Sequence, residues 1–220
     1  SLIHVPYTLD NETKLSDDYK KHFAFAEEKL TELAELASIA GTDYENSEVY
    51  KKNQSLFEGR VNSEDKEVQA KVAAITDADY VRLPVFEERE KIQKQILNLP
   101  LFPTTTIGSF PQTSDVRKNR QEFKKGLKSR EEYVEFNKKK IAECIKLQEE
   151  IGLDVIVHGE FERNDMVEYF GEHLNGYLFT EKAWVQSYGT RNVKPPIIWG
   201  DVSRREAITV EWSKFAKSCT

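Results

Sequence analysis

The sequence predicts an α/β fold after about residue 100 and a mostly helical region before it. Short β-branched or apolar runs at 104–107, 153–158 and 196–199 are separated by helix-length amphipathic segments. Strands joined by helices in this order predict a parallel sheet with right-handed crossovers. Before residue 100, apolar residues recur at helical spacing, and Pro100 and Pro103 mark a boundary between the two regions.

The elements of the first region are predicted from apolar spacing and capping patterns. A short strand at 2–6 is followed by one long helix that Gly41 would end. Thr42 and Glu45 have the spacing of a capping box for a helix at 43–60, and further helices are expected at 64–75 and 86–97. The apolar stripe of the long helix consists of Tyr19, Phe23, Ala26, Leu30, Leu33 and Ala37.

The elements of the second region are predicted in the same way. Helices are expected at 115–125 and at 130–150, where Ser129 and Glu132 form a capping box and Gly152 provides the stop. The strand at 153–158 follows at once. A short helix at 164–172, an aromatic-rich segment at 177–188, the apolar run at 196–199 and a last helix at 206–216 complete the chain.

Composition excludes several classes of function. The net charge of −6 argues against general nucleic-acid binding. No apolar run approaches the ~20 residues that span a bilayer, and residues 1–6 lack the features of a signal peptide. Cys144 and Cys219 have no metal-type or redox spacing, and Cys144 lies on an apolar helix face, which predicts a buried thiol. Together these features indicate a cytoplasmic protein.

Candidate ligand-binding residues follow the predicted strands. The run 157–172 places an imidazole, carboxylates and an amide directly after an apolar strand, and working residues of α/β proteins gather at such strand ends. Three strand ends can converge: they offer Ile107, Gly108 and Ser109, then His158 and Glu160, and then the loop 188–192 with Arg191 and Asn192.

An amino-acid ligand suits this set of groups. Gly108 lets a ligand approach the backbone, Ser109 offers a hydroxyl and an amide N–H to a carboxylate, and Glu160 can pair with an ammonium. Such a charge-assisted pair contributes roughly 1.5–3 kcal/mol when it is partly desolvated.

Each candidate also has a structural interpretation. Ser109 could cap the next turn, Glu160 could pair with Arg163, and His158 is more often a satisfied core histidine than a base. Arg191 could pair with a local carboxylate. A solvated helix face is expected for Asp165, Glu168 and Glu172. The sequence contains no Gly-rich phosphate loop, no Ser-His-Asp elbow and no convincing zinc spacing.

Several long motifs, in order, resemble the family of cobalamin-independent methionine synthases. The matching segments are 102–112, 153–160, 163–172, 184–189, 193–198 and 200–204. The resemblance implies methyl transfer from 5-methyltetrahydropteroyltri-L-glutamate to L-homocysteine, without cobalamin. It also implies that 1–40 ends an N-terminal barrel, that 41–100 is a helical connector, and that 101–220 starts a C-terminal TIM (β/α)8 barrel. Because a complete barrel takes about 250 residues, this chain would hold part of one.

The resemblance also assigns substrate-binding residues. It implies that homocysteine is held by Ile107, Gly108, Ser109 and Glu160, and that folate contacts Arg191 and Asn192. The family commonly has cysteine after the arginine, so Asn192 departs from the pattern. Three milder departures stand near the site, namely Ala183 for glycine, Thr190 for serine and Arg205 for proline.

The resemblance further implies a zinc ion that activates homocysteine as a thiolate. Its ligands and the proton-donating histidine would lie downstream of Thr220, so no catalytic or metal-binding residue is expected within this chain. We therefore expect an internal fragment that is inactive alone and that has the remaining parts of its own enzyme as a partner. The alternatives are a non-catalytic amino-acid-binding homologue and a related zinc-dependent thiol methyltransferase.

Overall fold

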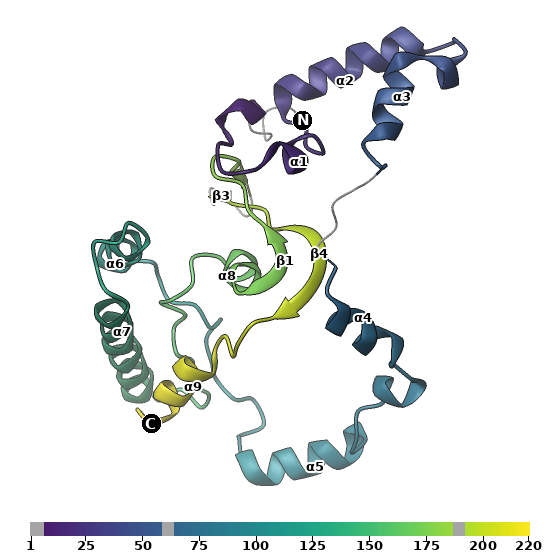
Figure 1. Ribbon diagram of the computed structural model, residues 1–220. Coiled ribbons are helices and arrows are strands. Elements are labelled where there is room, and N and C mark those ends of the chain that lie inside the picture. Colours follow the sequence, from purple (N-terminus) through teal and green to yellow (C-terminus); the bar gives the residue numbers. More distant parts are fainter. Residues whose placement is uncertain (1–6, 59–63, 187–191) are drawn as a thin grey trace. The chain divides into compact units, whose positions relative to one another are not determined.

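The computed structural model describes residues 7–58, 64–186 and 192–220 (Figure 1). The chain divides into two compact units. Unit 1 comprises Ser1–Lys71 and Val167–Arg205, and unit 2 comprises Val72–Met166 and Glu206–Thr220. In the described part of the chain, we find no helix with the length and apolar character that crossing a membrane requires.

Unit 1 combines short helices with two small antiparallel sheets. Its helices are α1 (Asp17–Lys20), α2 (Ala26–Ile39), α3 (Glu48–Ser55), most of α4 (Lys66–Ala73) and most of α8 (Met166–Glu172). Strand β1 (Leu174–Leu178) pairs with β4 (Ile197–Arg204), and β2 (Val185–Gln186) pairs with β3 (Asn192–Val193). Strands β1 and β4 curve around α8 (Figure 1), where a Cβ on Gly171 would lie 2.8 Å from the Phe179 ring.

Unit 2 is mainly helical. It contains α5 (Phe86–Leu97), α6 (Ser114–Lys124), α7 (Arg130–Ile151) and α9 (Val210–Lys217). The expected helix at 86–97 is confirmed, and the helices expected at 115–125, 130–150 and 206–216 are confirmed with shifted ends. The capping box of Ser129 and Glu132 opens α7, and Gly152, at φ 82°, ends it in the left-handed conformation.

Two expectations for the first region are wrong. The apolar stripe from Tyr19 to Ala37 is divided between α1 and α2, because the Glu28 carboxylate accepts the N–H groups of Phe25 (2.9 Å) and Leu9 (3.0 Å) and so starts a new helix at Ala26. Thr42 and Glu45 do not open a helix; the hydroxyl of Ser47 caps α3 instead, accepting the Tyr50 N–H. The strand expected at 2–6 lies outside the described residues.

The expected parallel sheet does not form among the described residues, where both sheets are antiparallel. The run at 196–199 does begin a strand, β4, but 104–107 and 153–158 run side by side without becoming strands. The backbone contacts there are Val155 N–H to Thr104 O (3.0 Å), Phe110 N–H to Gly159 O (2.9 Å) and one parallel bridge between Ser109 and Gly159.

Side chains form hydrogen bonds with backbone groups of these two segments that would otherwise pair in a strand ladder. The Asp154 carboxylate accepts the Thr104 N–H at 2.7 Å. The Gln148 amide accepts the Val157 N–H (3.0 Å) and donates to the Val157 carbonyl (2.7 Å), as a neighbouring strand would do. Because these backbone groups are satisfied by side chains, no regular ladder forms, yet 107–109 still lies beside 158–160.

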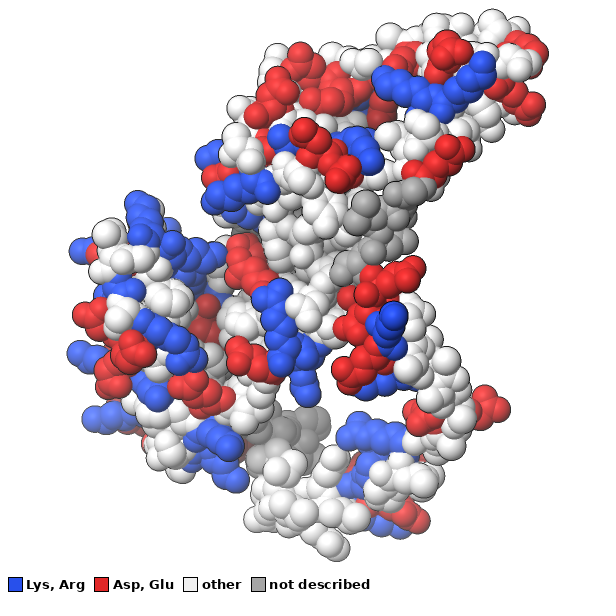
Figure 2. Space-filling model, in the orientation of Figure 1, with Lys and Arg blue, Asp and Glu red and all other residues white. Residues whose placement is uncertain are grey.

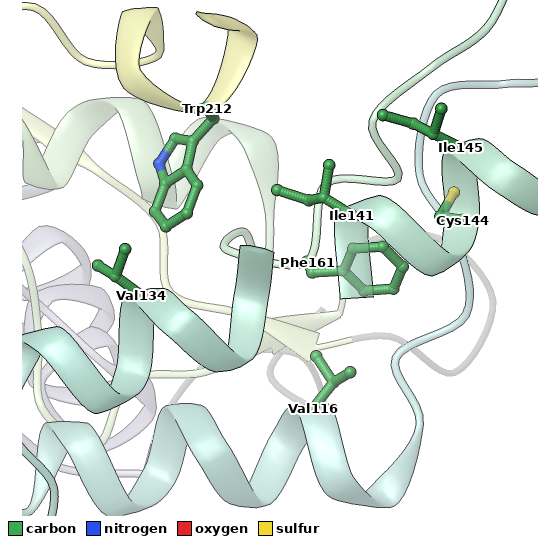
Figure 3. Close-up of a cluster of buried hydrophobic side chains, with 7 residues drawn as sticks. All are labelled: Val116, Val134, Ile141, Cys144, Ile145, Phe161 and Trp212. Atoms are coloured by element: carbon green, nitrogen blue, oxygen red, sulfur yellow. The ribbon is translucent and has the colours of Figure 1, made fainter. Parts of the chain in front are cut away.

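The core of unit 2 is a cluster of buried side chains from three helices and one loop (Figure 3). Helix α7 supplies most of it, α6 and α9 each supply one residue, and Phe161 enters from the loop that follows residue 158. Ile141 is fully buried. The cluster consists of Val116, Val134, Ile141, Cys144, Ile145, Phe161 and Trp212.

Unit 1 is held together by contacts between its first residues and its last ones. Trp199 of β4 is buried against Tyr19, with ring centroids 4.6 Å apart. Glu12 is fully buried, and its carboxylate accepts the backbone N–H groups of Glu181 (2.5 Å), Lys182 (2.8 Å) and Ala183 (2.9 Å). The segment that leads into β2 is therefore tied to the start of the chain.

Candidate functional site

The candidate site lies on a loop of unit 2 that we call the Glu160 loop, residues 158–163. Gly159 has φ 89°, and Glu160 has φ 57°, a left-handed conformation that non-glycine residues seldom adopt. A Cβ on Gly159 would lie 2.5 Å from Cε2 of Phe161 and 3.1 Å from Sγ of Cys144. Glycine is thus required at 159, because the loop sits directly on the core.

Three of the four residues predicted to bind homocysteine come together here. Gly108 has φ 108°, and a Cβ there would lie 3.3 Å from Oε1 of Glu160, while Ser109 is bridged to Gly159. Ser109 is exposed, and its hydroxyl has no hydrogen-bond partner among the described residues. Ile107 precedes them with its side chain 91% exposed. The backbone turn at 107–109 therefore faces the Glu160 carboxylate.

Charged side chains hold the Glu160 carboxylate in place. Arg163 donates from Nη1 to Oε1 of Glu160 (3.1 Å) and from Nε to Oε1 of Glu162 (3.0 Å). His158 Nε2 lies 3.1 Å from the same Glu162 oxygen. The structural interpretations of His158 as a satisfied histidine and of Glu160 as a partner of Arg163 are both confirmed as contacts.

Burial and hydrogen bonding set the ionisation of two groups at the base of the loop. Burial alone would raise the pKa of Glu162. The hydrogen bond and charge of His158, a backbone hydrogen bond and the charge of Arg163 together outweigh burial, and the pKa of Glu162 is therefore lowered. Burial raises the pKa of the Cys144 thiol, against a smaller opposite effect of the Gln148 hydrogen bond. The predicted buried thiol is confirmed, and Glu162 is a buried carboxylate.

Arg120 is a residue of the site that the sequence analysis missed. Its Nη2 atom donates to the carbonyl oxygens of Phe161 (2.9 Å) and Arg163 (2.8 Å), and to Oε1 of Gln112 (2.6 Å). A signal existed, because Arg120 lies four residues after the buried Val116 and so shares its helix face. The guanidinium fixes both ends of the segment 161–163.

Of the two predicted folate-contacting residues, Asn192 belongs to unit 1 and Arg191 lies outside the described residues. Asn192 is exposed at the start of β3, opposite Gln186 of β2. The expectation of a solvated face for Asp165, Glu168 and Glu172 is wrong for Glu168, which is only 4% exposed because α8 turns that side inward.

The described residues do not fit a zinc site. They contain no group of three or more His, Cys, Asp or Glu side chains that could hold a metal ion. Acidic and basic side chains are interspersed on the face seen in Figure 2. The Glu160 loop instead brings together two carboxylates, Glu160 and Glu162, with the Arg163 guanidinium and the His158 imidazole.

Comparison with known proteins defines the class. Residues 102–220 match the family model described as "Cobalamin-independent synthase, Catalytic domain". This match covers more than half of the chain, which therefore belongs to the cobalamin-independent synthase family.

Relatives agree with this assignment. The chain is 59% identical over 218 residues to a Campylobacter jejuni protein named 5-methyltetrahydropteroyltriglutamate–homocysteine methyltransferase, with 99% of the chain covered. Proteins of the same name from Bifidobacterium adolescentis and Lactococcus lactis are 58% and 56% identical, with the whole chain covered. The chain spans 29% of the length of each of these relatives.

Proposed function

We propose that this chain is part of an enzyme that transfers a methyl group from 5-methyltetrahydropteroyltri-L-glutamate to L-homocysteine, giving L-methionine. The observation that carries the proposal is the placement of the exposed Ser109 and the turn at Gly108 against the Glu160 carboxylate, within the matched catalytic domain. The names of the relatives supply the two substrates. We propose that these 220 residues belong to a longer polypeptide, the full-length protein.

The proposed architecture follows the family. Residues 1–40 would end an N-terminal barrel, 41–100 would form a connector, and 101–220 would begin a TIM barrel that other parts of the same enzyme complete. The side-by-side course of 104–110 and 154–159 supports two neighbouring barrel strands. The zinc that the resemblance implies would be held by residues outside this chain. We also expect the enzyme to work in the cytoplasm.

In this proposal the chain binds and orients homocysteine. The Glu160 carboxylate pairs with the substrate ammonium, and the hydroxyl and backbone N–H of Ser109 donate to the substrate carboxylate. Gly108 leaves room for the ligand, since a side chain there would approach the Glu160 carboxylate. The two contacts fix the amino-acid end of the substrate, so that its thiol is presented to the methyl donor. Ile107 borders the same turn, and Arg191 and Asn192 would contact the folate.

The test is steady-state kinetics of the full-length protein with both substrates. Glu160→Gln removes a charge-assisted pair worth roughly 1.5–3 kcal/mol, so the KM for homocysteine should rise about 10- to 100-fold. Ser109→Ala should raise it by a smaller factor. Glu149→Gln is a matched control, because Glu149 is an exposed carboxylate of α7 away from the Glu160 loop. An unchanged KM in Glu160→Gln would remove the site assignment.

The chain alone is expected to be inactive. Purified chain, zinc and both substrates should give no methionine above background, because the proposed site is incomplete within these residues. Turnover above background would contradict this proposal. Micromolar homocysteine binding by the isolated chain, measured by calorimetry, would favour an amino-acid-binding module instead.

A further inference from the structure

The conformation of Glu160 raises the question of what holds it. A non-glycine residue seldom adopts the left-handed region, and it persists there only where its surroundings fix it. The flanking residues are fixed on the core side. Phe161 is buried in the cluster of Figure 3, and Arg120 binds the carbonyl oxygens of Phe161 and Arg163. These contacts hold the backbone of the loop.

The side chain of Glu160 is held by a separate set of contacts. Arg163 bridges two carboxylates, with Nη1 on Glu160 and Nε on Glu162. The Glu162 side chain is 1% exposed and is itself fixed by His158 at 3.1 Å. The Arg163 side chain is 13% exposed, whereas that of Glu160 is 25% exposed. The contacts therefore run from a buried anchor at Glu162 outward to the carboxylate that faces Gly108.

The charges of Glu160, Glu162 and Arg163 have a second consequence. Two carboxylates share one guanidinium, so the three groups carry a net charge of −1 before His158 is counted. A bound ammonium would bring that charge to zero. If Glu162 were neutral, Arg163 would pair with Glu160 alone, so less of the Glu160 charge would be left for an ammonium. Glu162 thus aims the guanidinium and adds a second negative charge beside the carboxylate that would meet a cationic ligand.

We infer that Glu162 and Arg163 are positioning residues that hold the Glu160 carboxylate for the ammonium group of the amino-acid substrate. This inference rests on the proposed function, and it extends the site from the carboxylate that would touch substrate to two residues that act through it. It gives the site a specificity for thiols that carry an α-ammonium over otherwise identical thiols that lack one.

The test compares homocysteine with its deaminated analogue, 4-mercaptobutanoate, in the full-length protein. Glu162→Gln keeps size and hydrogen bonding but removes the charge, so the KM for homocysteine should rise about tenfold with kcat nearly unchanged. The KM for 4-mercaptobutanoate should change by less than about twofold, because it lacks the ammonium. A merely structural role for Glu162 would raise both values together.

Three further variants make the test robust. Glu162→Asp keeps the charge and should recover most of the preference for homocysteine. In Arg163→Lys a single ammonium cannot span both carboxylates, so part of the preference should be lost. Glu149→Gln should match the parent. KM values do not depend on the amount of folded enzyme, so poor folding of one variant does not hide the result.

The outcomes separate the two proposals. A parent protein that does not convert homocysteine overturns the proposed function and this inference with it. A parent that prefers homocysteine to 4-mercaptobutanoate, with the same preference in Glu162→Gln, overturns this inference alone. An equal rise of both KM values in Glu162→Gln also overturns it.

Discussion

Glu12 in unit 1 and Glu162 in unit 2 are both buried carboxylates, and the two units hold them by different means. Glu12 is bound by three consecutive backbone N–H groups, at residues 181–183. Glu162 is bound by charged or chargeable side chains, His158 and Arg163. Backbone N–H donors hold a loop in place without adding a formal charge. Side-chain donors bring a charge of their own, as Arg163 does where it contacts both Glu162 and Glu160.

The largest effect is expected from removing Glu12. Glu12→Ala leaves three N–H groups, one buried and two partly buried, without their acceptor and should cost about 3 kcal/mol locally. The amides of Glu181, Lys182 and Ala183 should then exchange their hydrogens roughly 100-fold faster, measured residue by residue by NMR.

The amides of the Glu160 loop, in unit 2, should keep their exchange rates in Glu12→Ala. Glu27→Ala, an exposed carboxylate of α2, is the control and should leave residues 181–183 protected. Unchanged exchange at 181–183 in Glu12→Ala would show that the carboxylate is not what anchors this segment.

The contrast between the two carboxylates also marks the limit of what the sequence predicts. The Glu12 contacts join residues about 170 positions apart, and no local pattern signals them. The capping box of α7 and the stop at Gly152 are local, and both were predictable. The approach of Gly108 and Ser109 to Glu160 was predicted from a parallel sheet, of which the described segments form a single bridge. These residues still lie close together because a few backbone contacts, together with side-chain hydrogen bonds, hold the two segments side by side.

A smaller effect on stability is expected at acid pH, and it depends on the ionisation of Glu162. The folded pKa of Glu162 is lowered, so the group binds fewer protons in the folded chain than in the unfolded chain at mildly acid pH. Its stabilisation is present above the ordinary glutamate pKa of about 4.3 and is lost as pH falls through the folded value. Between pH 7 and about pH 3.5, the parent chain should lose about 1 kcal/mol more stability than Glu162→Gln.

Urea unfolding followed by circular dichroism at the two pH values measures this difference. Carboxylates away from the Glu160 loop titrate alike in both proteins, so the comparison reports Glu162 together with the groups that contact it. Glu149→Gln, the exposed control on α7, should follow the parent. An equal loss in the parent and in Glu162→Gln would mean that the ion contacts of the loop add nothing to folding.

The smallest effect is expected at alkaline pH, from the thiol beneath the same loop. The pKa of Cys144 is raised, chiefly by burial, so the folded chain keeps a proton that the unfolded chain releases above the ordinary thiol pKa of about 8.5. This contribution is present below that value and is lost as pH rises, the opposite direction to Glu162. Between pH 7 and about pH 9.5, the parent should lose up to about 1 kcal/mol more stability than Cys144→Ala in urea unfolding.

Cys219→Ala, at the more exposed thiol, should behave as the parent does. If Cys144→Ala lost as much stability as the parent, the packing of Sγ under Gly159 would not control the ionisation of Cys144, and the base of the Glu160 loop would be open to water.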